Sequence, residues 1–284
     1  MTPLVNTPAN TAQIDYWNAQ AGKTWSENQE RLDRQLDGLG RAAQAVLAPA
    51  PGERLLDLGC GCGQTTLELA LAAGPSGHLT GVDISAPMLE VARARPRPPA
   101  AAPVVWRQAD AQTADLGEAG FDAAFSRFGV MFFADPVVAF TNIGRAVRSK
   151  GRMAFVCWRP LAENLWMRGP LEAAAPLLPP SPPADPHAPG PFAFADPDRP
   201  CALLTTAGWR NISVAPHDAM VGAGDIEETL AMSLKVGPLG AALRESPDLV
   251  LRVTDRVRAF LEGHVGDRGV ELPAAVWLIR AERP

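Results

Sequence analysis

Between residues 49 and 160, short runs of consecutive apolar residues alternate with longer segments in which apolar residues recur every three or four positions. The short runs predict strands that are buried on both faces, and the longer segments predict helices between them. The predicted strands are 54–58, 78–82, 104–109, 121–125 and 152–158. This alternation predicts an α/β fold, in which helices cover both faces of a doubly wound parallel sheet.

The segments before and after this alternation have other patterns. Residues 1–48 predict an N-terminal helical cap, because apolar residues from Leu36 to Leu47 keep helical spacing until Pro49. Residues 161–200 hold a large share of the chain's 28 prolines. Such a run cannot form a core element, and it predicts a stiff excursion past the edge of the sheet.

The last part of the chain returns to strand and helix signals. A predicted strand at 208–214 leads into a second insertion at 222–266. That insertion contains three amphipathic helices, at 226–234, 239–243 and 249–261. An apolar run at 270–280 predicts the final strand. We therefore expect a single domain over residues 1–284, with its core at 49–160.

Three alternate glycines follow the first predicted strand and precede a helix. Gly59, Gly61 and Gly63 allow backbone angles that are closed to other residues and let a ligand approach the main chain. The helix that follows directs free N–H groups and a positive dipole end toward that ligand. The pyrophosphate-binding pattern G-x-G-x-x-G does not fit, because the third glycine comes one place early and Gln64 takes its position. Asp57 suits a neighbouring ammonium or sulfonium group better than a pyrophosphate.

A second motif, Gly81-Val82-Asp83-Ile84-Ser85, ends the second predicted strand. Together with Asp57-x-Gly59-x-Gly61-x-Gly63 it resembles the class I S-adenosylmethionine-dependent methyltransferases, in particular the ubiquinone- and menaquinone-biosynthesis-like branch that acts on small molecules. The resemblance implies a Rossmann-like doubly wound sheet of seven strands in the order 3-2-1-4-5-7-6, with strand 7 antiparallel. It also implies an N-terminal helical lid and helical insertions after strands 5 and 6.

The resemblance implies S-adenosyl-L-methionine as the cofactor and assigns residues to its parts. Asp83 takes the ribose hydroxyls. Ile84 and Met88 are well placed to pack on an adenine face, and they can equally be core residues. Asp110 and the backbone of Ala111 read the adenine edge. The full set of predicted cofactor-binding residues is Tyr16, Trp25, Asp57, Gly59, Cys60, Gly61, Gln64, Asp83, Ile84, Met88, Asp110, Ala111, Ser126 and Arg127.

The aromatic residues of the N-terminal segment allow two interpretations. Tyr16 and Trp25 can form a lid whose ring faces stabilise the sulfonium, as the resemblance implies. They can equally serve only to dock the N-terminal helices on the domain. The sequence leaves both open.

The methyl acceptor is expected beside the cofactor, at the carboxyl ends of strands 4 and 5. Phe128, Met131, Trp166 and Phe192 are its predicted contacts, and Asn164, His187 and Phe194 are further candidates. The implied reaction is an in-line displacement that methylates an O, N or C atom of a small, fairly apolar metabolite. Positioning can supply much of the catalysis, so no catalytic residue is assigned. Two alternatives remain, an NAD(P)-dependent oxidoreductase and a noncatalytic S-adenosylmethionine-binding protein.

The amino-acid composition and net charge indicate which classes of partner the protein can have. Hydrophobic residues make up 47% and charged residues 20% of the chain, and the net charge is -5. These values are ordinary for a globular protein and do not favour nucleic acid as a partner. No apolar stretch has spanning length, so we expect a cytoplasmic protein, a monomer or homodimer, without membrane contact. No metal site is expected, because the spacing of Cys60, Cys62, Cys157 and Cys201 does not match a zinc site.

Overall fold

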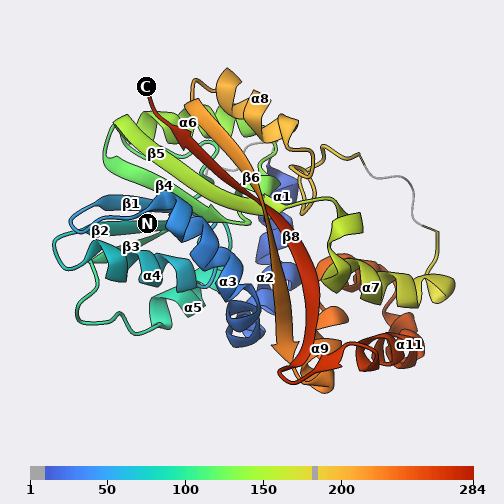
Figure 1. The fold of residues 1–284 in the computed structure, drawn as a ribbon. Helices are drawn as coiled ribbons and strands as arrows, with labels where there is room; N and C mark the ends of the chain where they lie inside the picture. Colours follow the sequence, from blue (N-terminus) through green and yellow to red (C-terminus); the bar gives the residue numbers. More distant parts are fainter. Residues whose placement is uncertain (1–9, 181–184) are drawn as a thin grey trace.

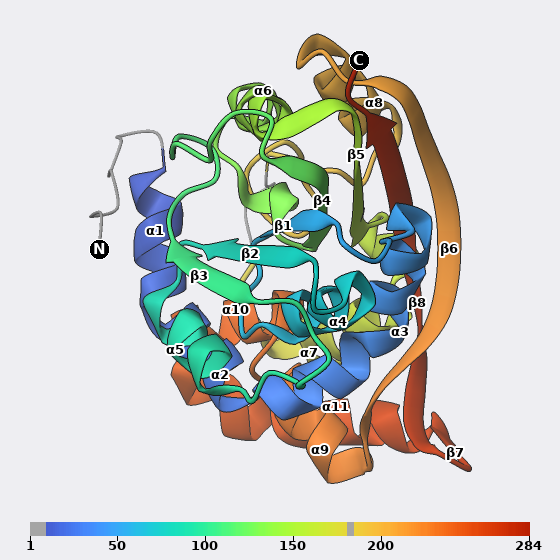
Figure 2. The ribbon, with the colours of Figure 1, turned by 90° about the vertical axis from the view of Figure 1, so that its left-hand side faces the viewer.

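A single sheet runs through the protein and carries helices on both of its faces (Figures 1 and 2). The computed structural model describes residues 10–180 and 185–284. The composition of residues 1–12 predicts a loose N-terminal end. Residues 1–9 of this segment and residues 181–184 of the proline-rich run lie outside the described residues, whereas the first helix already begins at Thr11. The strand order is β3-β2-β1-β4-β5-β8-β6, and a short β7 pairs with β8.

Strands β1 to β5 pair with one another in parallel. Strand β8 is antiparallel to its neighbours β5, β6 and β7. The strands are β1 (Arg54–Leu58), β2 (His78–Asp83), β3 (Val104–Gln108), β4 (Phe121–Arg127), β5 (Val147–Trp158), β6 (Arg210–Gly224), β7 (Val265–Gly266) and β8 (Gly269–Glu282). The predicted order 3-2-1-4-5-7-6 is confirmed, with β8 in the place of the seventh strand. The two-residue β7 was not predicted, and it makes the sheet eight-stranded.

Helices connect the strands and form the N-terminal cap and the insertions. They are α1 (Thr11–Asn18), α2 (Gln20–Glu27), α3 (Gln29–Leu47), α4 (Gln64–Ala73), α5 (Ala86–Ala94), α6 (Pro136–Ala146), α7 (Leu165–Ala174), α8 (Asp198–Thr206), α9 (Ile226–Ser233), α10 (Gly237–Glu245) and α11 (Val250–Glu262). Helix α3 packs with α4 on one face of the sheet, and α6 packs with α8 on the other. The insertion helices α7, α9, α10 and α11 bury a second apolar cluster of their own, beside the sheet (Figure 1).

Local signals set several element boundaries. Asp135 accepts a hydrogen bond from the backbone N–H of Val138 at 3.1 Å and so caps α6, as its position before Pro136 predicts. The apolar spacing after Pro136, followed by Lys150-Gly151, predicts a helix that ends at Lys150–Gly151, and this prediction is wrong. The helix ends at Ala146, because Val147 already pairs with Phe121 as the first residue of β5.

Two other expectations needed correction. Leu71 was expected to face the core from α4, yet 52% of it is exposed. The helix turns its small residues Ala70 and Ala73 inward instead. Strand β6 runs to Gly224, well past the predicted end, because it pairs with β8 over nearly its whole length. None of the helices in the described ranges combines the length and the apolar character that crossing a bilayer requires.

Candidate active site

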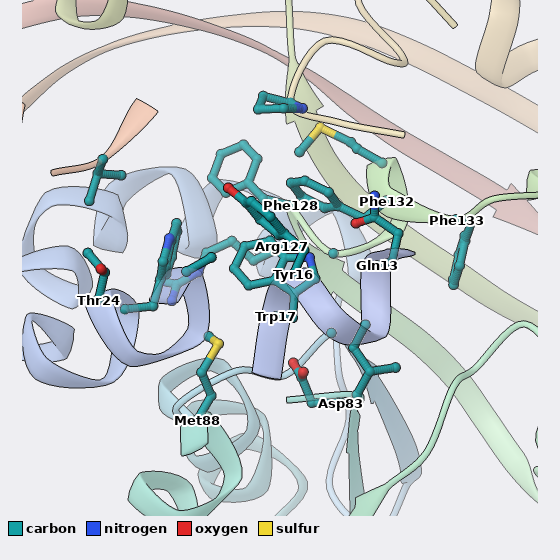
Figure 3. A pocket seen from close by; sticks show the side chains of 18 of the residues that line it. Gln13, Tyr16, Trp17, Thr24, Asp83, Met88, Arg127, Phe128, Phe132 and Phe133 are labelled. Atoms are coloured by element: carbon teal, nitrogen blue, oxygen red, sulfur yellow. The ribbon is translucent and has the colours of Figure 1, made fainter. Parts of the chain in front are cut away.

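A cavity of about 410 Å³ opens at the carboxyl edge of the parallel strands. Its walls come from the loops after β1, β2, β3 and β4, from helices α1 to α3, and from the insertion helices α7 and α10. Ligands bind at this edge in doubly wound sheets, and the volume lies within the usual range of small-molecule sites. Figure 3 shows side chains from these separate elements converging on the cavity.

The glycine loop lies at the floor of this cavity. Gly59, Gly61 and Gly63 have φ angles of +64°, +54° and +85°, which favour glycine. The N–H groups of Gly59 and Cys60 donate to the carbonyl oxygen of Val82 at 2.9 and 3.2 Å. The loop is therefore anchored to β2, and of its residues Gly59 lines the cavity.

Asp83 joins the glycine loop to the end of β2. Its carboxylate accepts hydrogen bonds from the N–H groups of Gly61 at 2.7 Å and Ser85 at 2.8 Å. Burial raises the pKa of this carboxyl group, and these backbone hydrogen bonds oppose the rise. Asp83 also lines the cavity, as Figure 3 shows. A carboxylate oxygen has two lone pairs, so each can still accept a hydrogen bond from a ligand hydroxyl.

Asp110 stands next to Asp83 in the adjacent loop. The N–H of Ala109 donates to the Asp83 carbonyl oxygen at 3.0 Å, so the two loops start side by side. Asp110 accepts from the N–H of Gln112 at 2.9 Å, and burial raises the pKa of its carboxyl group. Asn142 holds the Ala111 carbonyl oxygen at 2.9 Å. Ile84, Met88, Asp110 and Ala111, all predicted from the sequence, line the cavity.

Five predicted cofactor residues do not line the cavity: Asp57, Cys60, Gly61, Gln64 and Ser126. Cys60 and Gly61 belong to the glycine loop itself, and Asp57, Gln64 and Ser126 flank it. Ser126 donates to the Leu58 carbonyl oxygen at 2.7 Å and accepts from the N–H of Gly129 at 3.1 Å. Burial raises the pKa of the Cys60 thiol well above its usual value.

Asp57 is fully buried beneath the start of α4. One of its carboxylate oxygens accepts from the hydroxyls of Thr65 at 2.8 Å and Thr66 at 2.6 Å. Burial raises the pKa of Asp57 to about 6, although the two threonine hydrogen bonds act in the opposite direction. In this arrangement Asp57 fixes the beginning of the helix that follows the glycine loop.

Arg127 extends from the end of β4 into the cavity wall (Figure 3). Its guanidinium donates to the Gln64 side-chain oxygen at 2.7 Å and lies 3.6 Å from Asp33. Asp33 also pairs with Arg95. Burial raises the pKa of Asp33 despite these two arginines. The network connects α3, α4 and β4 around one wall of the cavity.

The N-terminal helices are docked over the loop between β2 and α5. The Asn18 amide donates to the Ile84 carbonyl oxygen at 3.0 Å and accepts from the N–H of Ala86 at 2.9 Å. The Ser85 hydroxyl donates to the Trp17 carbonyl oxygen at 2.7 Å. Tyr16 and Trp25, predicted as a lid, line the cavity together with Trp17. The aromatic side chains of this segment therefore both dock the helices and face the site.

Aromatic rings line the opposite part of the cavity. Phe128 adopts a φ of +61°, which is unusual for a bulky residue, and its ring stacks on Trp158 at 4.1 Å with an interplanar angle of 7°. Trp158 in turn contacts Trp166 at 5.2 Å. The predicted acceptor residues Phe128, Met131, Trp166 and Phe192 all line the cavity.

The further acceptor candidates lie elsewhere. Asn164 is buried and accepts from the N–H of Ala275 at 2.9 Å, so it joins α7 to β8. Phe194 is part of the main hydrophobic core. His187 is exposed and does not line the cavity. These three residues follow β5 in the chain, but folding directs them away from the site.

The cavity also contains residues that the sequence analysis missed. The polar or charged ones are Asn10, Gln13, Thr24, Gln112, Lys235 and Arg244, and the aromatic ones are Trp17, Phe132, Phe133 and Trp158. The cluster of aromatic residues at the N-terminus was a signal for Trp17. No sequence signal marked Lys235 or Arg244, because α10 reaches the site only through tertiary packing. The described residues contain no cluster of three or more His, Cys, Asp or Glu suited to a metal ion.

Comparison with known proteins agrees with this geometry. Residues 56–155 match the family described as a methyltransferase domain. This stretch of the chain is a methyltransferase domain of the class I S-adenosylmethionine-dependent type. The resemblance drawn from the glycine loop and Asp83 is therefore confirmed.

Several methyltransferases are similar to this one. O-methyltransferase cnsE of Penicillium expansum is 32% identical over 141 residues, which are 49% of this chain and 48% of that protein. Demethylmenaquinone methyltransferase of Lactococcus lactis subsp. lactis is 30% identical over 105 residues, or 37% of this chain and 42% of that protein. The match to this methyltransferase thus spans less than half the length of either relative.

One solved structure has the same fold. Phosphoethanolamine N-methyltransferase 2 of Haemonchus contortus, solved with S-adenosyl-L-methionine, superposes with a TM-score of 0.51 at 16% identity. The match covers 87% of this methyltransferase and 52% of that chain. At this identity the likeness shows the shared fold alone.

Proposed function

We propose that the protein transfers the methyl group of S-adenosyl-L-methionine to a small, fairly apolar acceptor. The observation that carries this proposal is the division of one cavity into two parts. Asp83 and Asp110 stand side by side at the ends of β2 and β3, and aromatic rings line the opposite part. The names of relatives that methylate small molecules support the same reaction class.

The residues present fit the cofactor by their donor and acceptor chemistry. Two neighbouring carboxylates suit a ligand that presents hydroxyl and amino donors. In our proposal Asp83 accepts from the ribose hydroxyls, and Asp110 and the Ala111 N–H recognise the adenine edge. Ile84 and Met88 pack against the adenine faces.

The methionine part is assigned to the other end of the glycine loop. Arg127 provides a cation there for the carboxylate, and Gly59 lets the chain of the ligand approach the backbone. Asp57, Gln64 and Ser126 contribute by holding this loop and α4 in place. Tyr16 and Trp25 close the site from above and exclude water.

The bound cofactor supplies a methyl group that its sulfonium charge already activates. The protein must then hold the acceptor atom in line with that methyl group. Phe128, Trp158 and Trp166 offer flat apolar surfaces for this, with Met131 and Phe192 beside them. Among the described residues that line the cavity, the carboxylates are Asp83 and Asp110 and there is no histidine. Both carboxylates are assigned to the cofactor, so the proposal relies on positioning and includes no general base.

The proposal keeps a cytoplasmic location and a monomer or homodimer, and it includes neither nucleic acid nor a membrane as partner. Calorimetric titration with S-adenosyl-L-methionine, S-adenosylhomocysteine and NAD in parallel tests it first. We expect the two sulfur compounds to bind and NAD not to bind. Binding of NAD alone would support the oxidoreductase alternative. Transfer of a labelled methyl group to phenols, quinols, amines or acids would then separate an enzyme from a noncatalytic binding protein.

A further inference from the structure

Charge is unevenly distributed around the cavity. Its two lining carboxylates, Asp83 and Asp110, belong to the proposed cofactor part. Its lining cations are Arg127, Lys235 and Arg244. Arg127 already contacts Gln64 and Asp33, whereas Lys235 and Arg244 form no ion pair within the described part of the chain.

Packing of the turn between α9 and α10 fixes these two cations. A Cβ atom on Gly240 would lie 2.3 Å from the Lys235 backbone, so only glycine allows this close approach. The Arg244 guanidinium donates to the Lys235 carbonyl oxygen at 3.1 Å. Lys235, in the turn before α10, and Arg244, on α10, are therefore held next to each other, and both line the cavity. Its first turn, at Gly237 and Pro238, lines the cavity as well and adds a positive helix end.

Arg244 also reaches the N-terminal lid. Its guanidinium donates to the Tyr16 hydroxyl oxygen at 3.0 Å, and its central carbon lies 5.9 Å from the centre of the tyrosine ring. Both partners of Arg244 are uncharged oxygen atoms. A half-buried guanidinium with neutral partners retains its attraction for a carboxylate, because no fixed negative charge compensates it.

We propose that the acceptor is an aromatic compound that carries an anionic group of the carboxylate class, and that Lys235 and Arg244 bind this group. The rings of Phe128, Trp158 and Trp166 hold the aromatic part. The inference rests on the proposed methyl transfer and narrows its substrate class. Arg244 would therefore contact both the bound anion and Tyr16 of the lid.

Matched acids and amides test the anion site without requiring turnover. The probes are 4-hydroxybenzoate, 3-hydroxy-2-naphthoate and 1-hydroxy-2-naphthoate, each compared with its primary amide. Binding is measured by calorimetry in the presence of saturating S-adenosylhomocysteine. We expect at least one acid to bind about tenfold or more tightly than its amide, as a charge-assisted hydrogen bond would produce.

Three variants test whether Lys235 and Arg244 cause the tighter binding of the acid. The double variant Lys235→Gln and Arg244→Gln should abolish the difference between acid and amide. Arg252→Gln removes an exposed cation from α11, outside the cavity, and should keep the difference. Tyr16→Phe leaves both cations in place and should also keep it, which separates loss of the anion site from loss of the lid contact.

Each outcome decides the inference. If no acid binds more tightly than its amide, or if none of the acids binds, the anion site is refuted. Retention of the preference in the double variant would also refute it. Failure of S-adenosylhomocysteine to bind would overturn the proposed function itself, whereas binding of this compound without any acid preference would overturn only the substrate class.

Discussion

Gly59 and Gly129 pack against each other with no room for a side chain. A Cβ atom on Gly59 would lie 2.7 Å from the Cα atom of Gly129, and a Cβ atom on Gly129 would lie 2.7 Å from the Leu58 carbonyl oxygen. The loop after β4 therefore supports the glycine loop from behind. Ser126 adds two hydrogen bonds to the same contact. The shape of the cavity floor thus depends on a residue outside the glycine motif.

Gly129→Ala should disturb the glycine loop. The added methyl group has to displace backbone atoms, and such overpacking costs about 1–3 kcal/mol of unfolding free energy. We expect a lower melting temperature and weaker binding of S-adenosylhomocysteine. Gly38→Ala is the matched control, since Gly38 lies on the exposed face of α3 with nothing within 4 Å of its added Cβ. That change should stabilise the helix slightly. Unchanged affinity in Gly129→Ala would disprove the supporting role.

Asp83→Asn should weaken cofactor binding more than it weakens the fold. The asparagine oxygen can still accept one backbone N–H, but the charge that would attract the ribose hydroxyls is lost. Loss of hydrogen bonds to a charged group should reduce affinity by about tenfold to a hundredfold. Asp122→Asn serves as control, because Asp122 also accepts a hydrogen bond from a backbone N–H, that of Arg54, at 2.8 Å. Asp122 lies at the start of β4, whereas Asp83 lies at the carboxyl end of β2. Equal affinities of both variants, measured by calorimetry, would remove the ribose assignment.

Asp57→Asn should change how stability depends on pH. The pKa of Asp57 is raised from 3.8 to about 6 by burial, so the folded state becomes less stable as the carboxyl group ionises. This penalty is absent below pH 3.8 and complete above about pH 6. The stability of the variant relative to the native protein should therefore rise by about 2 kcal/mol between pH 4 and pH 7. Denaturant unfolding across this range measures the slope.

Asp122→Asn offers a control of opposite sign for the same experiment. Burial alone would raise the pKa of Asp122, but hydrogen bonds from Arg54 and Arg148 lower it overall. Its ionised form therefore stabilises the folded state above the unfolded pKa, and this contribution is lost as the pH falls. The stability of the Asp122→Asn variant relative to the native protein should fall as the pH rises. Parallel slopes for the two variants would contradict the account of Asp57.

Asn18→Ala should loosen the attachment of the N-terminal helices, which we propose act as a lid. Asn18 makes two hydrogen bonds to the loop after β2, and each contributes about 1 kcal/mol. We expect cofactor affinity to fall by about fivefold or more, with faster dissociation in stopped-flow measurements. Lys23→Ala changes an exposed residue on α2 and should have little effect. If Asn18→Ala releases the cofactor no faster than Lys23→Ala does, the N-terminal helices are not a lid.

Local sequence was enough to place the two carboxylates of the cavity. Asp83 ends β2 and Asp110 follows β3, and the carboxyl ends of adjacent parallel strands meet at one edge of a sheet. The alternation of strand and helix likewise predicted the α/β fold, whereas the order of the strands was implied by the family resemblance. The direction in which individual side chains point was harder to predict from the sequence. Asp57 lies directly before Leu58 in β1. Because side chains alternate between the two faces of a strand, the Asp57 side chain points to the face beneath α4.

The sequence by itself therefore determined the α/β fold, the glycine loop and the positions of Asp83 and Asp110, because each depends on neighbours in the chain or on the rules of parallel sheets. Only the tertiary structure decided which helices cover the cavity. Arg244 donates to Tyr16 across 228 positions of sequence, and Gly129 supports Gly59 from another loop. Such contacts arise when separate elements pack around a common core, and no periodicity or local motif encodes which side chains will then meet.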